Sequence, residues 1–449
     1  MRAFKAYDIR GHYPGDWNAG DAYKIGYFLP RLLKTNKILV GRDVRLSSVE
    51  IFDNLCHGIN DGGAEVVNLG LSTTPMVYWA TAKYGFDASV QITASHNPRD
   101  HNGLKISGRD ALPVGYDNGL KKIKEWMQKE NCLPSEKKGK ISSFDVKGDY
   151  THFLLKRKPD LHGLRLAVDC SNGMAGLFIR DLLGDDPVYI NEEPDGNFPG
   201  HDPNPLNPEN VVQLSETVKK NNCDLGIIFD GDADRVMFVD ETGRFISPDL
   251  MIAVLGHKLL PGNPGARVLQ DIRTSKSVGQ YLAKMGAEMH TWKVGRAFAA
   301  PRLREIEGLY GGELAGHYYF REFYYSDSGL LAALYILEVI SAFKSRDVSV
   351  SSLILSINTN ANSGEINFTV EDKASAIVHV TQEITASEKP VKMYDFDGVR
   401  LEFDNWWFNI RPSNTEPYLR LIAEARDEDL LESRLQKIKT ALKPFIKAR

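Results

Sequence analysis

The segment Lys37-Ile-Leu-Val-Gly-Arg-Asp43 joins a short apolar strand to a polar turn that begins with an aspartate. The same pattern occurs in Leu164-Arg-Leu-Ala-Val-Asp169 and in Ala266-Arg-Val-Leu-Gln-Asp271. A helix predicted after the first copy ends in Gly62-Gly-Ala-Glu-Val66, and one predicted after the third copy ends in Gly286-Ala-Glu-Met289. Strands that alternate with helices favour mixed sheets with helices on both faces. The sequence therefore predicts one α/β unit that is used three times.

Three polar or turn-rich stretches separate these units from one another and from the C-terminal region. Residues 121–148 predict a lysine-rich helix and a charged loop, residues 261–265 are a cluster of turn residues, and residues 358–364 form a polar stretch. The last region is predicted to contain a strand, a helix, two strands and a final amphipathic helix. We expect an α/β protein with three similar α/β domains, each with a mixed sheet, and a C-terminal α+β domain. The predicted domains are residues 1–148, 149–258, 259–362 and 363–449.

The length and charge of the chain exclude several classes of protein. Its 449 residues correspond to about three typical domains of ~150 residues, so several cores are expected. The 55 Lys and Arg residues against 59 Asp and Glu residues give a net charge of −4, so no broad basic surface attracts nucleic acid or an anionic membrane. Any anionic partner must therefore bind in a local pocket.

The cysteines and the start of the chain indicate a cytoplasmic protein. The four cysteines form no CxxC pair, which suggests neither a zinc site nor a disulfide framework. No apolar run approaches the roughly 18 residues of a membrane-spanning helix, and Asp8 and Arg10 stand where a signal peptide would have its apolar segment. We expect no membrane partner, and the sequence leaves the oligomeric state open.

A serine loop follows an apolar strand in the first unit. The strand runs into Ala94-Ser95-His96-Asn97-Pro98, so Ser95 lies at a strand end, where reactive groups are commonly presented. The alternative is a turn in which the serine and asparagine bond their own backbone. His96 and Lys105 lie close in sequence and could hold an anion or move a proton. The GxSxG spacing is absent, so acyl transfer has no support.

An aspartate loop follows the apolar run Asp224-Leu-Gly-Ile-Ile-Phe229, which predicts a strand buried on both faces. The loop Asp230-Gly-Asp-Ala-Asp-Arg235 carries three carboxylates that can converge on one cation, and oxygen-only ligands favour Mg²⁺. A calcium EF-hand is rejected, because Arg235 stands at the position that must be glycine. A solvated structural turn remains the alternative.

Two further loops carry groups suited to a phosphorylated sugar. Tyr310-Gly-Gly-Glu-Leu-Ala-Gly-His317 combines glycines with Glu313, which suits vicinal hydroxyls, although an ordinary glycine-rich turn is the alternative. Arg411-Pro-Ser-Asn-Thr-Glu-Pro417 offers a guanidinium, two hydroxyls and an amide, which suit a phosphate. A solvated hairpin is the alternative there, but two prolines pre-order the loop, which lowers the cost of binding.

Together with Ala6-Tyr-Asp-Ile-Arg-Gly11, these loops closely resemble, in the same order, the motifs of the α-D-phosphohexomutase family. The resemblance covers nearly the whole chain and implies four domains around a central cleft. It also implies a phosphoserine at Ser95, Mg²⁺ as cofactor, a phosphorylated hexose as substrate and a hexose 1,6-bisphosphate as intermediate and activator. The implied catalytic residues are Ser95, Arg10, Lys105, His96 and Arg235; the implied metal ligands are Asp230, Asp232, Asp234 and Ser95; the implied substrate-binding residues are Arg273, Arg296, Glu313, His317, Arg411, Ser413, Asn414, Thr415 and Arg420.

Three positions depart from the family pattern. Ala315 stands where the family usually has serine, Arg296 where many members have histidine, and Arg273 where relatives often have lysine. The first departure removes the hydroxyl of that serine from the sugar loop, and the second leaves the general acid or base unassigned.

Residues 312–323 resemble the phosphomannomutase branch of the family, whose members interconvert mannose 1-phosphate and mannose 6-phosphate. Phosphoglucomutase activity, alone or combined with the mannose activity, is the nearest alternative, because the two sugars differ only at C2. Phosphoglucosamine mutase activity has less support, since Leu314 and Ala315 replace its usual Gln and Ser. A phosphosugar-binding protein without turnover and a phosphatase are the remaining alternatives.

Overall fold

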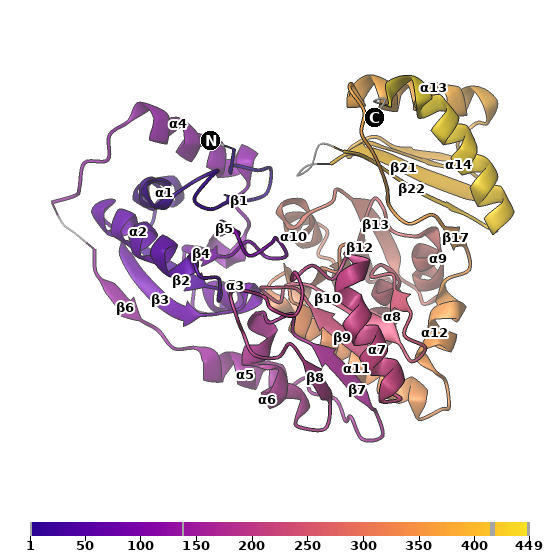
Figure 1. Cartoon of the computed structure of the whole chain (residues 1–449), viewed down its shortest axis with the longest axis horizontal. Coiled ribbons are helices and arrows are strands. Elements are labelled where there is room, and N and C mark those ends of the chain that lie inside the picture. The colour runs from indigo at the N-terminus through magenta and orange to yellow at the C-terminus, as the bar shows by residue number, and fades with distance from the viewer. Residues whose placement is uncertain (1, 137–138, 414–417, 447–449) are drawn as a thin grey trace.

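The computed structural model describes residues 2–136, 139–413 and 418–446, which form four sheets with flanking helices (Figure 1). Three consecutive units lie at the left and lower right of the view, and the C-terminal unit lies at the upper right. No helix in these residues is both long and apolar enough to cross a membrane.

The first unit has a six-stranded sheet in the order β1-β5-β4-β2-β3-β6. Its strands are β1 (Ile9–His12), β2 (Lys37–Arg42), β3 (Glu65–Leu71), β4 (Ala88–Ile92), β5 (His101–Gly108) and β6 (Ile141–Ser143). Its helices are α1 (Ala19–Leu33), α2 (Ser48–Asp61), α3 (Thr74–Lys83) and α4 (Lys121–Lys129), with the short turns η1 (Arg109–Ala111) and η2 (Tyr116–Leu120).

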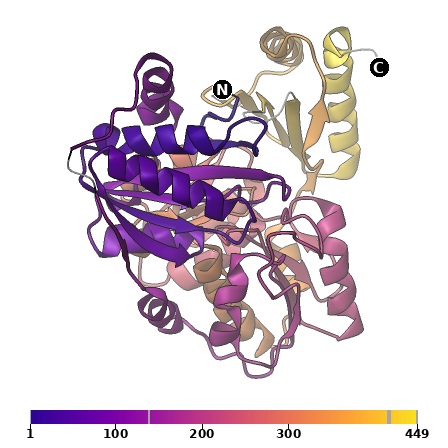
Figure 2. The same cartoon turned by 60° about the vertical axis from the view of Figure 1, so that its left-hand side comes forward.

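Alternation along β2 explains the layers of this unit. Ile38 and Val40 belong to a core shared with α1 and α2, whereas Leu39 belongs to a second core shared with α3. Successive side chains of a strand point to opposite faces, so an unbroken apolar strand buries both. Figure 2 shows α1 and α2 across one face of the sheet.

The second and third units have five-stranded sheets, in the orders β11-β10-β9-β7-β8 and β13-β12-β14-β15-β16. The second contains α5 (Lys147–Leu155), β7 (Leu166–Asp169), η3 (Met174–Leu177), α6 (Ile179–Leu183), β8 (Val188–Ile190), η4 (Pro208–Val211), α7 (Val212–Lys220), β9 (Leu225–Phe229), β10 (Val236–Asp240), β11 (Phe245–Ile246) and α8 (Leu250–Leu259). The third contains β12 (Arg267–Asp271), α9 (Lys276–Lys284), β13 (Glu288–Trp292), α10 (Arg296–Glu305), β14 (Tyr310–Gly312), β15 (Tyr318–Phe320), η5 (Arg321–Phe323), β16 (Ser326–Asp327), α11 (Gly329–Lys344) and α12 (Val350–Ile357).

The three units share one topology, as the repeated strand pattern predicted. In each, the first strand (β2, β7 or β12) lies between the second and third strands and parallel to both. The fourth strand (β5, β10 or β15) pairs antiparallel with the third. The prediction of three similar α/β units with mixed sheets is confirmed. One core, with members from Leu39 to Ile357, joins the three units.

The C-terminal unit has an antiparallel sheet in the order β17-β22-β21-β20-β19, and β18 also pairs with β22. Its elements are β17 (Ala361–Asn362), β18 (Ile366–Phe368), α13 (Lys373–Ser387), β19 (Lys392–Tyr394), β20 (Val399–Glu402), β21 (Trp406–Pro412), β22 (Leu419–Ala425), α14 (Glu428–Leu442) and η6 (Lys443–Phe445). Residues from Val370 to Leu442 form a core of its own.

One detail of the C-terminal unit differs from the sequence prediction. The helix α13 is followed by four strands rather than two, because β19 and β20 are short and β19 is partly exposed, which leaves little apolar pattern to detect. The domain boundaries remain a prediction, and those at residues 148 and 258 fall inside α5 and α8.

Candidate active site

The three site loops of the first three units occupy the same place in the shared topology. Each joins the third parallel strand to the antiparallel fourth strand: residues 93–100 between β4 and β5, 230–235 between β9 and β10, and 313–317 between β14 and β15. All three loops contribute residues to one cavity of about 630 Å³, to which the C-terminal unit also contributes.

Most of the predicted site residues meet in this cavity. Its lining includes Arg10, His96, Lys105, Asp234, Arg235, Arg273, Arg296, Glu313, Ala315, His317, Arg411, Ser413 and Arg420. Ser95, Asp230 and Asp232 lie directly behind it and are buried. Asn414 and Thr415 lie outside the described residues.

The serine loop directs its hydroxyl toward the aspartate loop. Ser95 has a φ of 53°, and its Oγ donates to Asp230 Oδ2 at 2.8 Å. The Nδ1 atom of His96 lies 3.3 Å from the same Oγ. The left-handed region is rarely occupied by residues other than glycine, and such strain concentrates at functional sites. The Ser95 hydroxyl therefore bonds the aspartate loop and not the backbone of its own turn.

The aspartate loop forms a buried cluster of carboxylates. Oxygen atoms of Asp230, Asp232 and Asp234 lie within 4.8 Å of one another, and all three side chains are fully buried. Burial, followed by repulsion from the other two carboxylates, raises the pKa of Asp230 well above its usual value. Lys105 Nζ lies 2.6 Å from Asp232 Oδ2 and also bonds Asp234.

This cluster fits a hard divalent cation. The Oδ1 atoms of Asp232 and Asp234 are buried and have no hydrogen-bond partner among the described residues. Buried carboxylate oxygens without partners are costly unless a cation or donor satisfies them. The donor set contains only oxygen atoms, which is the ligand type preferred by Mg²⁺.

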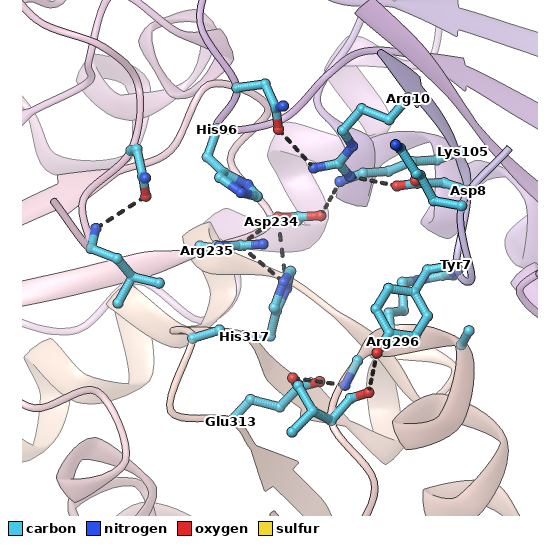
Figure 3. A pocket seen from close by; sticks show the side chains of 18 of the residues that line it. Tyr7, Asp8, Arg10, His96, Lys105, Asp234, Arg235, Arg296, Glu313 and His317 are labelled. Atoms are coloured by element: carbon cyan, nitrogen blue, oxygen red, sulfur yellow. Dashed lines mark hydrogen bonds and ion pairs between the residues drawn. The ribbon is translucent and has the colours of Figure 1, made fainter. Parts of the chain in front are cut away.

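The imidazole of His317 bonds one acidic and one basic side chain at the cavity. His317 Nδ1 lies 2.6 Å from Asp327 Oδ2, and Arg235 Nε donates to His317 Nε2 at 3.0 Å. Figure 3 shows Asp234 close to both Arg235 and His317. The ring is therefore held at both nitrogen atoms, and its orientation is fixed.

The glutamate of the third loop is held for contact with a ligand. Tyr319 donates to Glu313 Oε1 at 2.6 Å, and the amide of Gly295 donates to Oε2 at 3.0 Å. Burial raises the pKa of Glu313. Because each oxygen has accepted only one hydrogen bond, further lone pairs remain to accept hydroxyl groups.

Arg296 is fixed by three contacts. Its Nε donates to Asp327 Oδ1 at 3.2 Å, its Nη2 donates to the carbonyl of Ala111 at 2.8 Å, and its guanidinium stacks over Tyr78 at 3.5 Å. A guanidinium does not exchange protons near neutral pH, so this side chain acts as a fixed charge where many relatives have an imidazole.

Three further arginines line the cavity, and each is held by a carboxylate. Arg273 pairs with Asp271 at 2.7 Å and Arg411 pairs with Asp397 at 3.0 Å. Arg420 lies 3.0 Å from a Glu365 oxygen, and the other oxygen of that residue lies 3.6 Å from Arg273. These guanidinium groups come from two units and give the cavity wall the charge that an anion requires. The sequence did not identify the carboxylate partners of these arginines, which are Asp271, Glu365 and Asp397, nor Asp327, which bonds Arg296 and His317.

Two buried partners in the first unit were also missed. Thr74 donates to Asp232, and Arg45 binds backbone carbonyls of the serine loop. The sequence did contain a signal for Arg45, because Arg45 and Arg273 each follow the strand-end aspartate of the repeated pattern by two positions. No comparable signal marked Thr74.

Comparisons with known proteins agree over the whole chain. Four models described as phosphoglucomutase/phosphomannomutase domains, three alpha/beta/alpha domains and a C-terminal domain, match residues 1–132, 149–243, 247–358 and 365–441. The chain is 36% identical to a phosphomannomutase of Methanocaldococcus jannaschii over 449 residues, which covers 98% of each chain. It is 38% identical over 450 residues to a Xanthomonas campestris protein named phosphohexose mutases, covering 99% of each.

A solved structure supports the same assignment of the fold. The crystal structure of a phosphoglucomutase/phosphomannomutase family protein from Burkholderia thailandensis superposes with a TM-score of 0.90 at 28% sequence identity. The alignment covers 99% of this chain and 97% of that chain.

Proposed function

The chain belongs to the phosphoglucomutase/phosphomannomutase family, and on this basis we propose that it is a phosphomannomutase that interconverts mannose 1-phosphate and mannose 6-phosphate. The observation that carries the proposal is the position of Ser95, whose Oγ donates to Asp230 beside a cavity that is lined by arginine and lysine side chains from all four units. A phosphoserine there would lie at one end of the cavity, while Arg273 and Arg411 bind the second phosphate at the other.

The reaction exchanges one phosphoryl group between Ser95 and the sugar. A free hydroxyl of the hexose monophosphate attacks the phosphorus, a new O–P bond forms, and the bond from phosphorus to Ser95 Oγ breaks. The hydroxyl proton leaves to a base in the site. The resulting hexose 1,6-bisphosphate turns over in the cavity and returns its other phosphoryl group to Ser95. The same bisphosphate serves as the activator that first phosphorylates the enzyme.

The cationic residues near Ser95 stabilise the charge of the transferring group. Lys105 and Arg10 line this end of the cavity, and Arg10 is oriented by Asn97, which accepts from its Nη1 at 3.3 Å. Burial, followed by the charge of Arg235, lowers the pKa of His96 well below its usual value, which favours the neutral imidazole beside Ser95.

Asp230, Asp232 and Asp234 would hold Mg²⁺ together with Ser95, and the bound ion would withdraw charge from the phosphoryl group. Glu313 would accept hydrogen bonds from the sugar hydroxyls, and His317 would line the same subsite. Arg411, Ser413, Asn414, Thr415 and Arg420 would hold the phosphate that is not transferred. The proposal also includes the cytoplasmic location that the sequence predicts.

A dual phosphomannomutase and phosphoglucomutase activity is the second candidate. The family models carry both names, and the X. campestris relative is named for hexose phosphates in general. A comparison of rates on mannose, glucose and glucosamine 1-phosphates, with catalytic bisphosphate present, separates the candidates. A higher kcat/KM on mannose 1-phosphate supports the first proposal, and equal values on mannose and glucose support the second.

The Ser95→Ala variant tests the mechanism. We expect loss of isomerisation and, in the wild-type protein alone, one phosphate on Ser95 by intact mass analysis and peptide mapping. Ser142→Ala, a change in the same unit away from the cavity, is the matched control. Measuring isomer and free phosphate in one assay also distinguishes a mutase from a phosphatase and from a binding protein. Isomerisation by Ser95→Ala at the wild-type rate would contradict the mechanism.

A further inference from the structure

Arg45 is a buried arginine in the turn that follows β2, and it lies outside the cavity lining. Its side chain is almost completely removed from solvent, with 1% of the residue exposed. A cation is retained in such a position only when its donors are satisfied, because an unpaired buried charge is strongly destabilising. The partners of this side chain therefore indicate its role.

Those partners are the backbone carbonyls of the serine loop. Arg45 Nη2 donates to the carbonyl oxygens of Ser95 at 2.9 Å and Asn97 at 2.6 Å. Arg45 Nη1 donates to those of Pro98 at 2.6 Å and His101 at 3.1 Å. One planar guanidinium thus holds three carbonyl groups of the serine loop and the carbonyl of the first residue of β5. Its Nε atom lies 3.2 Å from Asp43 Oδ2, at the end of β2.

Both ends of this arrangement are themselves fixed. Asp43 Oδ1 accepts from the Arg45 amide at 3.0 Å and from the Ser48 hydroxyl at 2.6 Å. The ring of Phe198, from the second unit, lies 4.9 Å from the guanidinium. The side chain is therefore clamped between the central strand of the first sheet and a loop of the neighbouring unit.

The loop that Arg45 holds is strained at the reactive residue. Ser95 adopts a φ of 53°, and its Oγ reaches Asp230 Oδ2 at 2.8 Å. A residue other than glycine keeps a left-handed conformation only when its surroundings enforce it. The bond to the Ser95 carbonyl acts on the same residue whose side chain must point toward the carboxylate cluster.

We propose that Arg45 is the positioning residue for phosphoryl transfer, and that it fixes the Ser95 backbone so that Oγ faces the aspartate cluster. The proposal rests on the proposed role of Ser95 as the phosphorylated residue. Arg45 is not among the residues that line the cavity and reaches it only through the backbone of residues that do, so we expect its effect to fall on the transfer step more than on sugar binding. A displacement of about 1 Å at a reacting group can lower a rate by about 100-fold.

Lysine cannot reproduce this contact. The ammonium group has three donors on a flexible chain, whereas the guanidinium presents five donors in one rigid plane. Arg45→Lys keeps the buried charge and most of the volume but loses donors to the four carbonyls. This variant therefore separates the geometry of the fork from the charge, and Arg45→Met removes both.

The experiment measures kcat, KM and phosphoserine content in the full-length protein with Mg²⁺ and hexose 1,6-bisphosphate. For Arg45→Lys we expect kcat to fall about 100-fold, the KM for mannose 1-phosphate to stay within about twofold, and the Ser95 phosphate to form more slowly from the bisphosphate. Ile59→Val, a small change in the core of the same unit, controls for general loosening, and its kcat should stay within about twofold of wild type.

The experiment distinguishes failure of the proposed role of Arg45 from failure of the proposed role of Ser95. If Ser95→Ala is inactive but both Arg45 variants keep wild-type kcat, the role of Arg45 is wrong and the role of Ser95 stands. If kcat and KM change together, or if Ile59→Val gives the same loss, Arg45 acts only on the fold. Failure of Arg45→Lys to fold also overturns the positioning role. If Ser95→Ala remains active, the proposed function fails first.

Discussion

Replacing Lys105 with methionine would remove one cation from the carboxylate cluster while keeping most of the side-chain volume. Lys105 Nζ lies 2.6 Å from Asp232 Oδ2 and bonds Asp234, and only 11% of the lysine side chain is exposed. Burial opposes its protonation, but Asp232 and Asp234 more than offset this and raise the pKa of Lys105. The variant therefore removes the bonded cation of Asp232 and leaves Asp234 with only the more distant Arg235 and His317.

The size of the effect follows from this burial. Breaking a buried ion pair by removing one partner costs about 3–5 kcal/mol. For units of this size, each kcal/mol lowers the thermal midpoint by roughly 2–4 °C, so a shift on the order of 10 °C is expected. The loss should be largest without metal, because a bound cation would supply part of the missing charge. We also expect kcat to fall by about 10²–10³-fold, as for removal of one preorganised group that stabilises the transition state.

Thermal unfolding midpoints measured with EDTA and with saturating Mg²⁺ test this prediction. The difference between the two midpoints should be larger for Lys105→Met than for wild type. Lys37→Met is the matched control, since its ion pair with Glu65 at 3.7 Å is half-exposed and contributes at most about 1 kcal/mol. The reasoning is refuted if Lys105→Met and Lys37→Met lose the same stability in EDTA, or if Mg²⁺ stabilises Lys105→Met no more than wild type.

Three further predictions concern pH, metal binding and the sugar subsite. Burial raises the pKa of Asp249 to about 6, so the folded state binds this proton more tightly than the unfolded state, and the free energy of unfolding falls as pH rises from about 4 to about 6. In urea titrations, Asp249→Asn should remove this fall in the free energy of unfolding, which totals about 3 kcal/mol over the interval, whereas Asp185→Asn, at an exposed side chain, should keep it. Because the pKa of Asp230 is raised, protons compete with the cation for this carboxylate. The Mg²⁺ concentration that gives half-maximal activity should therefore rise as pH falls. An unchanged concentration would exclude this competition. Tyr319→Phe removes the donor at 2.6 Å from Glu313 and should lower kcat/KM by roughly 10- to 100-fold, while equal kcat/KM would show that the hydroxyl does not orient the carboxylate.

The sequence was sufficient for the fold because the strand pattern is repeated at three places. In each copy the strand-end aspartate accepts from the amide two residues later, at Arg45, Ser171 and Arg273. This local turn needs no distant partner, so it is visible in the sequence. The strands β19 and β20 were missed for the opposite reason, because their pairing depends on the neighbouring β21 and their own pattern is short.

The site residues were predictable where they lie on loops with distinctive composition, and their partners were not. Ser95, Asp230 and Glu313 stand in such loops. Arg296 and Asp327, by contrast, come together only when α10 packs beside β16. An ion pair of this kind depends on tertiary packing, and a single sequence carries no record of it.

The hydrophobic cores of the protein also indicate which unit can move during a reaction whose intermediate must reorient in the cavity. The first three units share one core, so their three loops are fixed relative to one another, whereas the C-terminal unit has a separate core. Its contact with the third unit includes Arg400, which donates to the carbonyls of Ile272 and Thr274 at 2.8 Å each. These carbonyls flank Arg273 in the chain. Arg273 follows β12 in the third unit and is bonded to Asp271, so it stays with the first three units. A rotation of the C-terminal unit about this contact would therefore move Arg411 and Arg420 relative to Arg273, while Ser95 and the aspartates stay in place.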